Sequence, residues 1–188
     1  MSPLIWVLII IIVLLIAIYI GVYNGLQRAR VHAQESWSQI DVQLNRRNDL
    51  IPNLVETVKG YAAHEKSTFS EVVKLRNQLN QVPASDHQEK MRVSNQLTDA
   101  LKSVFALREA YPDLKANQNF LKLQEELTNT ENKIAYSRQL YNSTVAFYDQ
   151  KLLTFPSNIV ASLHHLTKMD YLEVPEASKE VPKVSFKD

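Results

Sequence analysis

Residues 120–148, FLKLQEELTNTENKIAYSRQLYNSTVAFY, contain a strict seven-residue repeat of large apolar side chains. The members of the repeat are Phe120, Leu127, Ile134, Tyr141 and Tyr148. Seven residues make about two turns of an α-helix, so these side chains share one face that is suited to packing against other helices. The pattern predicts a long helix from about residue 117 to residue 153, which Phe155 and Pro156 then end.

A related periodicity, in steps of three and four, runs through residues 33–61. Its members are Ala33, Trp37, Ile40, Leu44, Ile51, Leu54, Val58 and Tyr61. The pattern resumes on the same face after Pro52, so we expect this proline to kink the helix without ending it. The sequence therefore predicts a second long helix.

Shorter apolar patterns predict the remaining elements. One helix is expected to begin at a capping box in residues 68–71, the next at an N-cap on Ser85, and a short one at residues 158–166 behind Ser157. The chain has only 3 glycines, which favours helices over sheets. We predict an all-α fold: an N-terminal transmembrane helix (1–23), an antiparallel bundle of about four long helices with a short extra helix (24–166), and an extended C-terminal tail (167–188).

Residues 4–20, LIWVLIIIIVLLIAIYI, contain no charged side chain. Extended through Val22, the run would span about 28 Å as a helix, close to the thickness of a bilayer core. Trp6 near one end and Tyr19 and Tyr23 near the other are suited to the membrane interfaces. A cleaved signal peptide is the alternative, but no basic residue precedes the run and its apolar core is longer than the usual stretch of about 7–15 residues. We expect a membrane anchor that is continuous with the first long helix.

The basic residues near this span lie on one side of it. No Lys or Arg precedes the span, whereas Arg28 and Arg30 follow it closely. The positive-inside rule then predicts a single-pass protein of the bacterial inner membrane, with its N-terminus outside and its C-terminal domain in the cytoplasm.

Composition and motifs point away from enzymatic chemistry. A net charge of +1, from 21 basic and 20 acidic residues, argues against a nucleic-acid binder, which usually has a clustered basic face. With no cysteine, the chain has no disulfides, thiolate metal sites or thiol catalysis. His64 and Glu65 could begin a zinc motif, but Thr68 occupies the position of the second histidine. We therefore predict no catalytic residue, no cofactor and no metal site.

Arg47 is a charged residue at a position of the 33–61 repeat where apolar residues are otherwise found. A guanidinium buried at such a position requires a partner. The candidate ion-pair residues are Arg46, Arg47, Asp49, Glu125, Glu126 and Glu131, with Glu131 or Glu125 as the preferred partner of Arg47. The pair could fix the register of the helices; alternatively, Arg47 could bind an anionic group or the carboxylate of a partner.

Two long stretches carry a family resemblance. They are AQESWSQIDVQLNRRNDLIPNLVETVKGYAAHEKSTF at residues 33–69 and YPDLKANQNFLKLQEELTNTENKIAYSRQLYNSTVAFYDQKLLTFPSNIVA at residues 111–161. With the N-terminal anchor and the VPKVSF tail, they closely resemble the LemA family of bacterial membrane proteins. The resemblance implies an anchored helical bundle without known enzymatic activity, often encoded near membrane-bound zinc metalloproteases.

Two functions are consistent with these features. The first is a non-enzymatic scaffold that is anchored in the bilayer and forms homo-oligomers at the inner face of the cytoplasmic membrane. The second is a regulatory adaptor for another envelope protein, such as a membrane-bound zinc metalloprotease. In the tail, Val184 and Phe186 alternate with polar residues and are candidate docking residues. An enzyme is the least supported class, because no nucleophile, base and orienting group are placed together.

Overall fold

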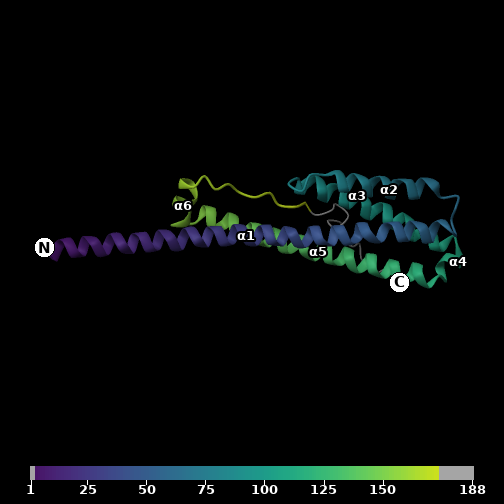
Figure 1. Ribbon diagram of the computed structural model, residues 1–188, viewed down its shortest axis with the longest axis horizontal. Coiled ribbons are helices and arrows are strands. Elements are labelled where there is room, and N and C mark those ends of the chain that lie inside the picture. The colour runs from purple at the N-terminus through teal and green to yellow at the C-terminus, as the bar shows by residue number, and fades with distance from the viewer. Residues whose placement is uncertain (1–2, 174–188) are drawn as a thin grey trace, which may run out of the picture. The chain divides into compact units, whose positions relative to one another are not determined.

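The computed structural model describes residues 3–173, and within that range all regular structure is helical (Figure 1). The long helices are α1 (Pro3–Lys59), α2 (Lys66–Gln81), α3 (His87–Ala106) and α5 (Gln118–Leu153). Short elements are the 3-10 turn η1 (Leu107–Glu109), α4 (Pro112–Lys115) and α6 (Ser157–Leu163). The predicted all-α fold with four long helices and a short extra one is confirmed, whereas η1 and α4 were not predicted.

Helix α1 runs without interruption from the apolar N-terminal segment through Gly21, Gly25 and Pro52. Pro52 has no N–H, so the carbonyl of Asn48, four residues earlier, lacks its helical donor. Arg76 on α2 replaces that donor, because its Nε lies 3.0 Å from the Asn48 carbonyl oxygen. The proline therefore stays inside the helix at a position where a neighbouring helix satisfies the freed carbonyl.

The described chain divides into two compact units, each of which takes part of α1 and part of α5. We call residues 3–41 and 136–171 the anchor unit, because they include the apolar segment. We call residues 42–135 and 172–173 the bundle unit.

The bundle unit has a hydrophobic core supplied by the second part of α1, by α2, α3 and α4, and by the first part of α5. Its fully or almost fully buried members include Ile51, Leu54, Val72, Leu97 and Phe120. Several of these residues belong to the repeats that predicted the helices. Tyr61, although a member of the repeat, is not buried in this core, because α1 ends at Lys59 and the residue remains 40% exposed.

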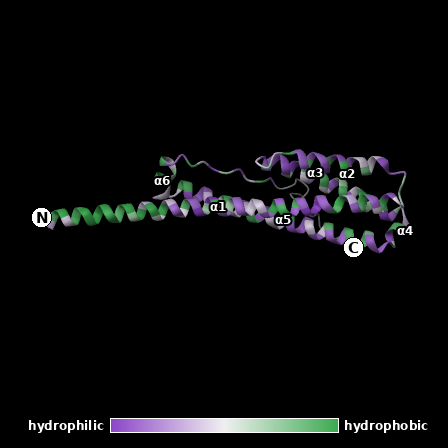
Figure 2. Cartoon of the chain, viewed as in Figure 1, coloured by the Kyte–Doolittle hydropathy of each residue, from purple (hydrophilic) through white to green (hydrophobic). Residues whose placement is uncertain are grey.

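The anchor unit has a smaller core with small residues on α1. Ala29 and Ala33 are buried there, and the rings of Trp37 and Tyr141 meet edge to face with centroids 6.0 Å apart. Leu26 on α1 packs against Val160 and Ala161 on α6. In Figure 2 the hydrophobic part of α1 ends close to α6.

The expected helix caps were wrong in detail. Thr68 lies inside α2, which begins at Lys66. Asp86, not Ser85, caps α3, because Asp86 Oδ1 accepts from the Glu89 N–H at 3.0 Å. Ser157 is the first residue of α6, and its hydroxyl donates to the carbonyl of Lys151 at 2.6 Å near the end of α5. In these three places a polar residue suited to capping lies near the correct helix end but is not the N-cap residue.

Candidate functional site

The bundle unit contains a buried polar layer centred on Arg47, whose side chain is 1% exposed. Arg47 Nη1 donates to Glu131 Oε2 at 2.9 Å and to Thr98 Oγ1 at 3.0 Å. Nη2 donates to Ser94 Oγ at 2.7 Å and to the Ser94 carbonyl at 3.3 Å. The guanidinium on α1 is therefore held by α3 and α5 together.

The partners on α3 are positioned by the period of the helix. Ser94 and Thr98 are four residues apart, so both side chains lie on the same face of α3. Thr98 Oγ1 lies 3.1 Å from Glu131 Oε1 and 3.1 Å from the Ser94 carbonyl, which links the three partners of Arg47 to one another. A charge removed from water needs such additional hydrogen bonds if its burial is to be tolerated.

Asn48, the next residue on α1, extends the layer to α2. Its Nδ2 donates to Asn80 Oδ1 at 2.7 Å, and its carbonyl accepts from Arg76 as described above. Asn48 is 5% exposed. Two adjacent residues of α1 thus make specific polar contacts with α2, α3 and α5, and a shift of α1 by one residue would break all of them.

The arrangement is suited to positioning helices. Four hydrogen bonds of the Arg47 guanidinium end on groups of its own chain. Glu131 balances the charge, and its side chain remains 37% exposed, so it reaches from the layer towards solvent. This geometry favours the internal ion pair over a site for an external anion. Within residues 3–173 there is also no group of three or more His, Cys, Asp or Glu residues placed to hold a metal ion.

The structure brings together only two of the six candidate ion-pair residues, Arg47 and Glu131. The remaining four candidates are exposed: Arg46, Asp49, Glu125 and Glu126. Five residues were expected at the membrane interfaces. Of these, Trp6 is 54% and Tyr19 39% exposed, Arg28 and Arg30 are exposed, and Tyr23 is half-buried. Val184 and Phe186 lie outside the described residues.

A second polar cluster, in the anchor unit, was not predicted. The hydroxyls of Tyr141 and Tyr148 each donate at 3.2 Å to the carbonyls of Asp170 and Thr167, respectively. Asp149, which is 6% exposed, accepts from the Met169 N–H at 3.2 Å. These contacts hold the extended segment after α6 against α5. The only signal in the sequence was an acidic residue directly beside a position of the repeat.

Burial raises the pKa of both tyrosines. For Tyr141, burial has the largest effect, and the negative charges of Asp170 and Asp149 act in the same direction. For Tyr148, burial also comes first, followed by Arg30, which lowers the pKa, and Asp149, which raises it. Both hydroxyls therefore remain protonated, as hydrogen-bond donors, throughout the neutral range.

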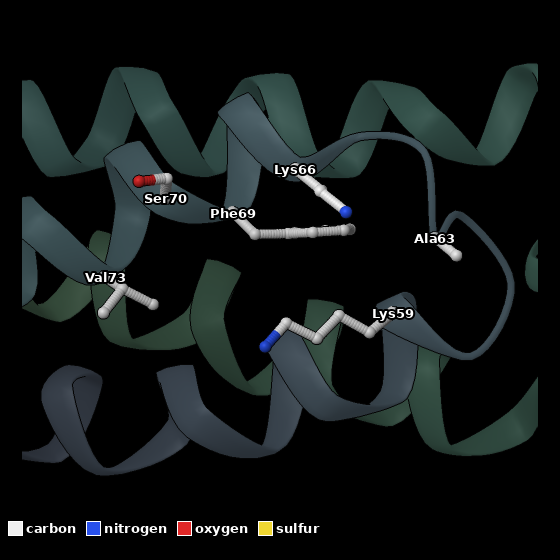
Figure 3. Close-up of a pocket in the computed structure, with 6 residues that line it drawn as sticks. All are labelled: Lys59, Ala63, Lys66, Phe69, Ser70 and Val73. Atoms are coloured by element: carbon white, nitrogen blue, oxygen red, sulfur yellow. The ribbon is translucent and has the colours of Figure 1, made fainter.

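The bundle unit also has a surface pocket of about 540 Å³ near the junction of α1 and α2 (Figure 3). Its lining residues are Lys59, Ala63, Lys66, Phe69, Ser70 and Val73. Two ammonium groups beside a largely apolar surface are suited to an acidic group on an apolar body. The lining has no carboxylate or imidazole that could serve as a general base.

Comparisons with known proteins agree with this architecture. The family model described as the LemA family matches residues 36–186. The chain belongs to the LemA family. The predicted resemblance is thereby confirmed over most of the chain.

Two named proteins are similar to this chain, at 25% and 23% identity. Protein LemA of Metamycoplasma hominis is 25% identical over 155 residues, which cover 82% of this chain and 70% of the relative. Magnetosome protein MamQ of Magnetospirillum gryphiswaldense is 23% identical over 163 residues, which cover 74% of this chain but 60% of MamQ. Neither name carries an enzymatic activity. Together with the apolar part of α1, these similarities indicate a membrane-associated protein.

Proposed function

We propose that this LemA-family chain is a non-enzymatic scaffold that is anchored in the inner membrane by α1 and self-associates at the cytoplasmic face. The observation that carries the proposal is a pair of exposed aromatic side chains on α5 in the anchor unit. Tyr136 is 69% and Phe147 54% exposed.

The two aromatic residues lie on the same side of α5. They are eleven residues apart, which is about three turns with an offset of only about 20°. The Lys151 ammonium lies 5.0 Å from the centroid of the Phe147 ring, so a basic group borders the apolar surface. Aromatic residues are enriched in protein interfaces, so two exposed rings on the same side of one helix favour contact with a second protein.

The anchor unit also supports assembly in the plane of a membrane. The apolar segment is part of the same helix as Leu26, Ala29 and Ala33, which pack the core of the unit. No unwound linker separates the segment from that core. The packed part of the unit would therefore be held close to the bilayer, where neighbouring copies can meet with a restricted set of orientations.

The orientation rests on Arg28 and Arg30, which are exposed on α1 just after the apolar segment. The chain has no natural cysteine, so a single cysteine introduced at exposed Val42 can be labelled selectively. In intact cells, a membrane-impermeant maleimide should leave Val42→Cys unlabelled until the membrane is opened. Labelling from outside would reverse the proposed orientation.

Native mass measurement of the full chain in lipid nanodiscs or mild detergent tests self-association. The wild type should have a mass that is a multiple of 21.6 kDa after correction for lipid and detergent. Tyr136→Ser combined with Phe147→Ser should shift the population to monomer. Val42→Ser is the matched control, because Val42 is 61% exposed but lies on α1 in the bundle unit. A monomeric wild type at high concentration would contradict the proposal.

The same purification distinguishes the adaptor function. A stable complex with a membrane-bound zinc metalloprotease or another envelope protein, in place of a homo-oligomer, would favour the adaptor. Loss of that complex in the Tyr136/Phe147 double variant would indicate that these two side chains on α5 contact the partner.

A further inference from the structure

The turn between α5 and α6 exposes four large apolar side chains. Their exposed fractions are 66% for Leu153, 80% for Phe155, 60% for Ile159 and 65% for Leu163. On α6, Ile159 and Leu163 are four residues apart and share the outer face, whereas Val160 and Ala161 are buried against Leu26 of α1. Helix α6 therefore has one face packed on α1 and one apolar face without cover in the anchor unit.

Side-chain contacts place this turn beside the end of the apolar segment. The His164 ring lies 4.6 Å from the Tyr23 ring, and its Nε2 lies 2.7 Å from the Tyr19 hydroxyl. On the other side of the turn, Lys151 Nζ lies 3.9 Å from the position that a Cβ atom would occupy on Gly25. The turn thus runs along α1 from the level of Gly25 to the level of Tyr19, a rise of about 9 Å.

The charges around the turn favour an anionic surface. Residues 150–169 contain no Asp or Glu, but they contain Lys151, His164, His165 and Lys168. Arg28 and Arg30 are exposed on α1 just beyond Gly25. Basic residues at the edge of an apolar surface are typical of segments that lie in the headgroup region of membranes with anionic lipids.

We propose that the α5–α6 turn is a second membrane contact, which inserts Leu153, Phe155, Ile159 and Leu163 into the interface of the leaflet that surrounds the C-terminal end of the span. The proposal rests on the membrane-spanning role given to α1 above. The rise of the turn along α1, about 9 Å, agrees with the depth to which amphipathic segments insert. Such segments bury their apolar face by about 5–10 Å in the headgroup and acyl boundary.

Lipid is favoured over a second copy of the chain because of where the apolar face lies. The end of α6 contacts Tyr19 and Tyr23, and within one helical turn of Tyr19 the apolar segment exposes Ile16 (53%) and Ile20 (50%). At the level of Tyr19, the neighbours of a membrane-spanning helix are lipids. This second contact would support the anchor unit on the bilayer and restrict the tilt of α1.

Spin labels in the full chain, reconstituted in nanodiscs with anionic lipid, test the proposal. Because the chain has no natural cysteine, single-cysteine variants can be labelled at Phe155 and Ile159. Leu14→Cys, within the apolar segment, is the control for the span, and Val31→Cys, 46% exposed on α1, is the control for the aqueous side. The measurement is the ratio of collision rates with oxygen, which enters lipid, and with a nickel chelate, which does not.

The expected ratio at Phe155 and Ile159 is several times the ratio at Val31 and lies between the ratios at Val31 and Leu14. If the ratio at Leu14 shows that it is in lipid but the ratios at Phe155 and Ile159 equal the ratio at Val31, the proposed membrane contact of the turn is wrong. The membrane-spanning role of α1 is then still supported. If Leu14 also matches Val31, the anchor itself is wrong and the second contact fails with it. Low accessibility to both reagents, with spin–spin broadening that disappears on dilution with unlabelled protein, would assign the turn to a second copy and overturn the proposal.

Discussion

The two units use the same pair of helices, α1 and α5, but fill the space beside them differently. In the bundle unit, Arg47 places a guanidinium among α1, α3 and α5 and satisfies it with Glu131, Ser94 and Thr98. In the anchor unit, α1 presents Ala29 and Ala33 at buried positions of the same helix. The buried face of α1 is therefore specified by directed hydrogen bonds at Arg47 in the bundle unit, but by small side chains that allow close packing in the anchor unit, whose own buried hydrogen bonds are made by α5.

This difference explains where each unit should tolerate change. A buried ion pair adds little net stability, but it strongly disfavours any register in which the charge loses its partners. Buried alanines add little transfer free energy, but they leave no space for a larger side chain. The layer around Arg47 should therefore be sensitive to removal of a group, and the positions of Ala29 and Ala33 to addition of one.

The largest effect is expected for Arg47→Ala. Removing the guanidinium leaves a cavity beside Ser94 and Thr98 and deprives Glu131 of its partner, and large-to-small substitutions at buried positions typically cost about 2–5 kcal/mol. Hydrogen exchange should show faster opening of α2 and α3 amides, while the amides of residues 136–153 change little. Arg46→Ala is the matched control, because Arg46 is the exposed neighbour on α1 and should leave exchange unchanged. Equal effects of the two substitutions would remove the polar layer as a specifying feature.

The opposite response is expected for Ala33→Leu. Ala33 is 0% exposed, and overpacking of a filled core costs typically about 1–3 kcal/mol. Exchange should accelerate in residues 136–153 and in α6, with little change in α2 and α3. Val31→Leu provides the control, since Val31 is exposed on α1. A stabilised Ala33→Leu protein would show that the anchor unit contains unused space.

A smaller effect, confined to the bundle unit, is expected for Asp86→Ala. Loss of the hydrogen bond from the Glu89 N–H should cost about 1 kcal/mol, as for other N-caps. Exchange of the first amides of α3 measures the loss. Ser85→Ala should have almost no effect, and a larger effect of Ser85→Ala would restore the cap that the sequence had predicted.

An effect of similar size at neutral pH, in the anchor unit, is expected for Tyr141→Phe. Loss of the hydrogen bond to the Asp170 carbonyl should cost about 0.5–1.5 kcal/mol. The raised pKa of Tyr141 means that its contribution is complete below the ordinary pKa of tyrosine, near 10.0, and is lost as the pH rises through the higher pKa of the folded state.

Tyr141→Phe should therefore lose less stability than the wild type when the pH is raised above the ordinary pKa of tyrosine. Tyr148 still titrates in both proteins, so the difference between them isolates Tyr141. Tyr136→Phe, at a 69% exposed position, is the control and should follow the wild type. An alkaline decline that is identical in wild type and Tyr141→Phe would contradict the role of this hydroxyl.

Much of the fold could be predicted because periodicity is a local signal. Phe120, Leu127, Ile134, Tyr141 and Tyr148 are all buried along α5, as their spacing predicts. The unexpected position of Arg47 in the apolar repeat likewise pointed to Glu131 as one of two preferred partners. Helix ends were less predictable, since Ser85 and Asp86 are both good capping residues and only the backbone geometry of the loop selects Asp86.

The anchor unit shows what sequence reasoning could not reach. The contact of Asp149 with the Met169 N–H requires the chain to reverse after α5 and return along it, which no local pattern indicates. The exposed Phe155 and Ile159 had no significance until contacts between His164 and α1 placed the α5–α6 turn beside the apolar segment. Both features depend on how distant segments meet.

The most direct test of the proposed scaffold is cysteine cross-linking in native membranes. We expect Tyr136→Cys and Phe147→Cys to form cross-linked dimers of the full chain with a short bifunctional maleimide, whereas Val42→Cys should not. Absence of cross-links at both aromatic positions, or equal cross-linking at all three, would contradict self-association through the aromatic face of α5.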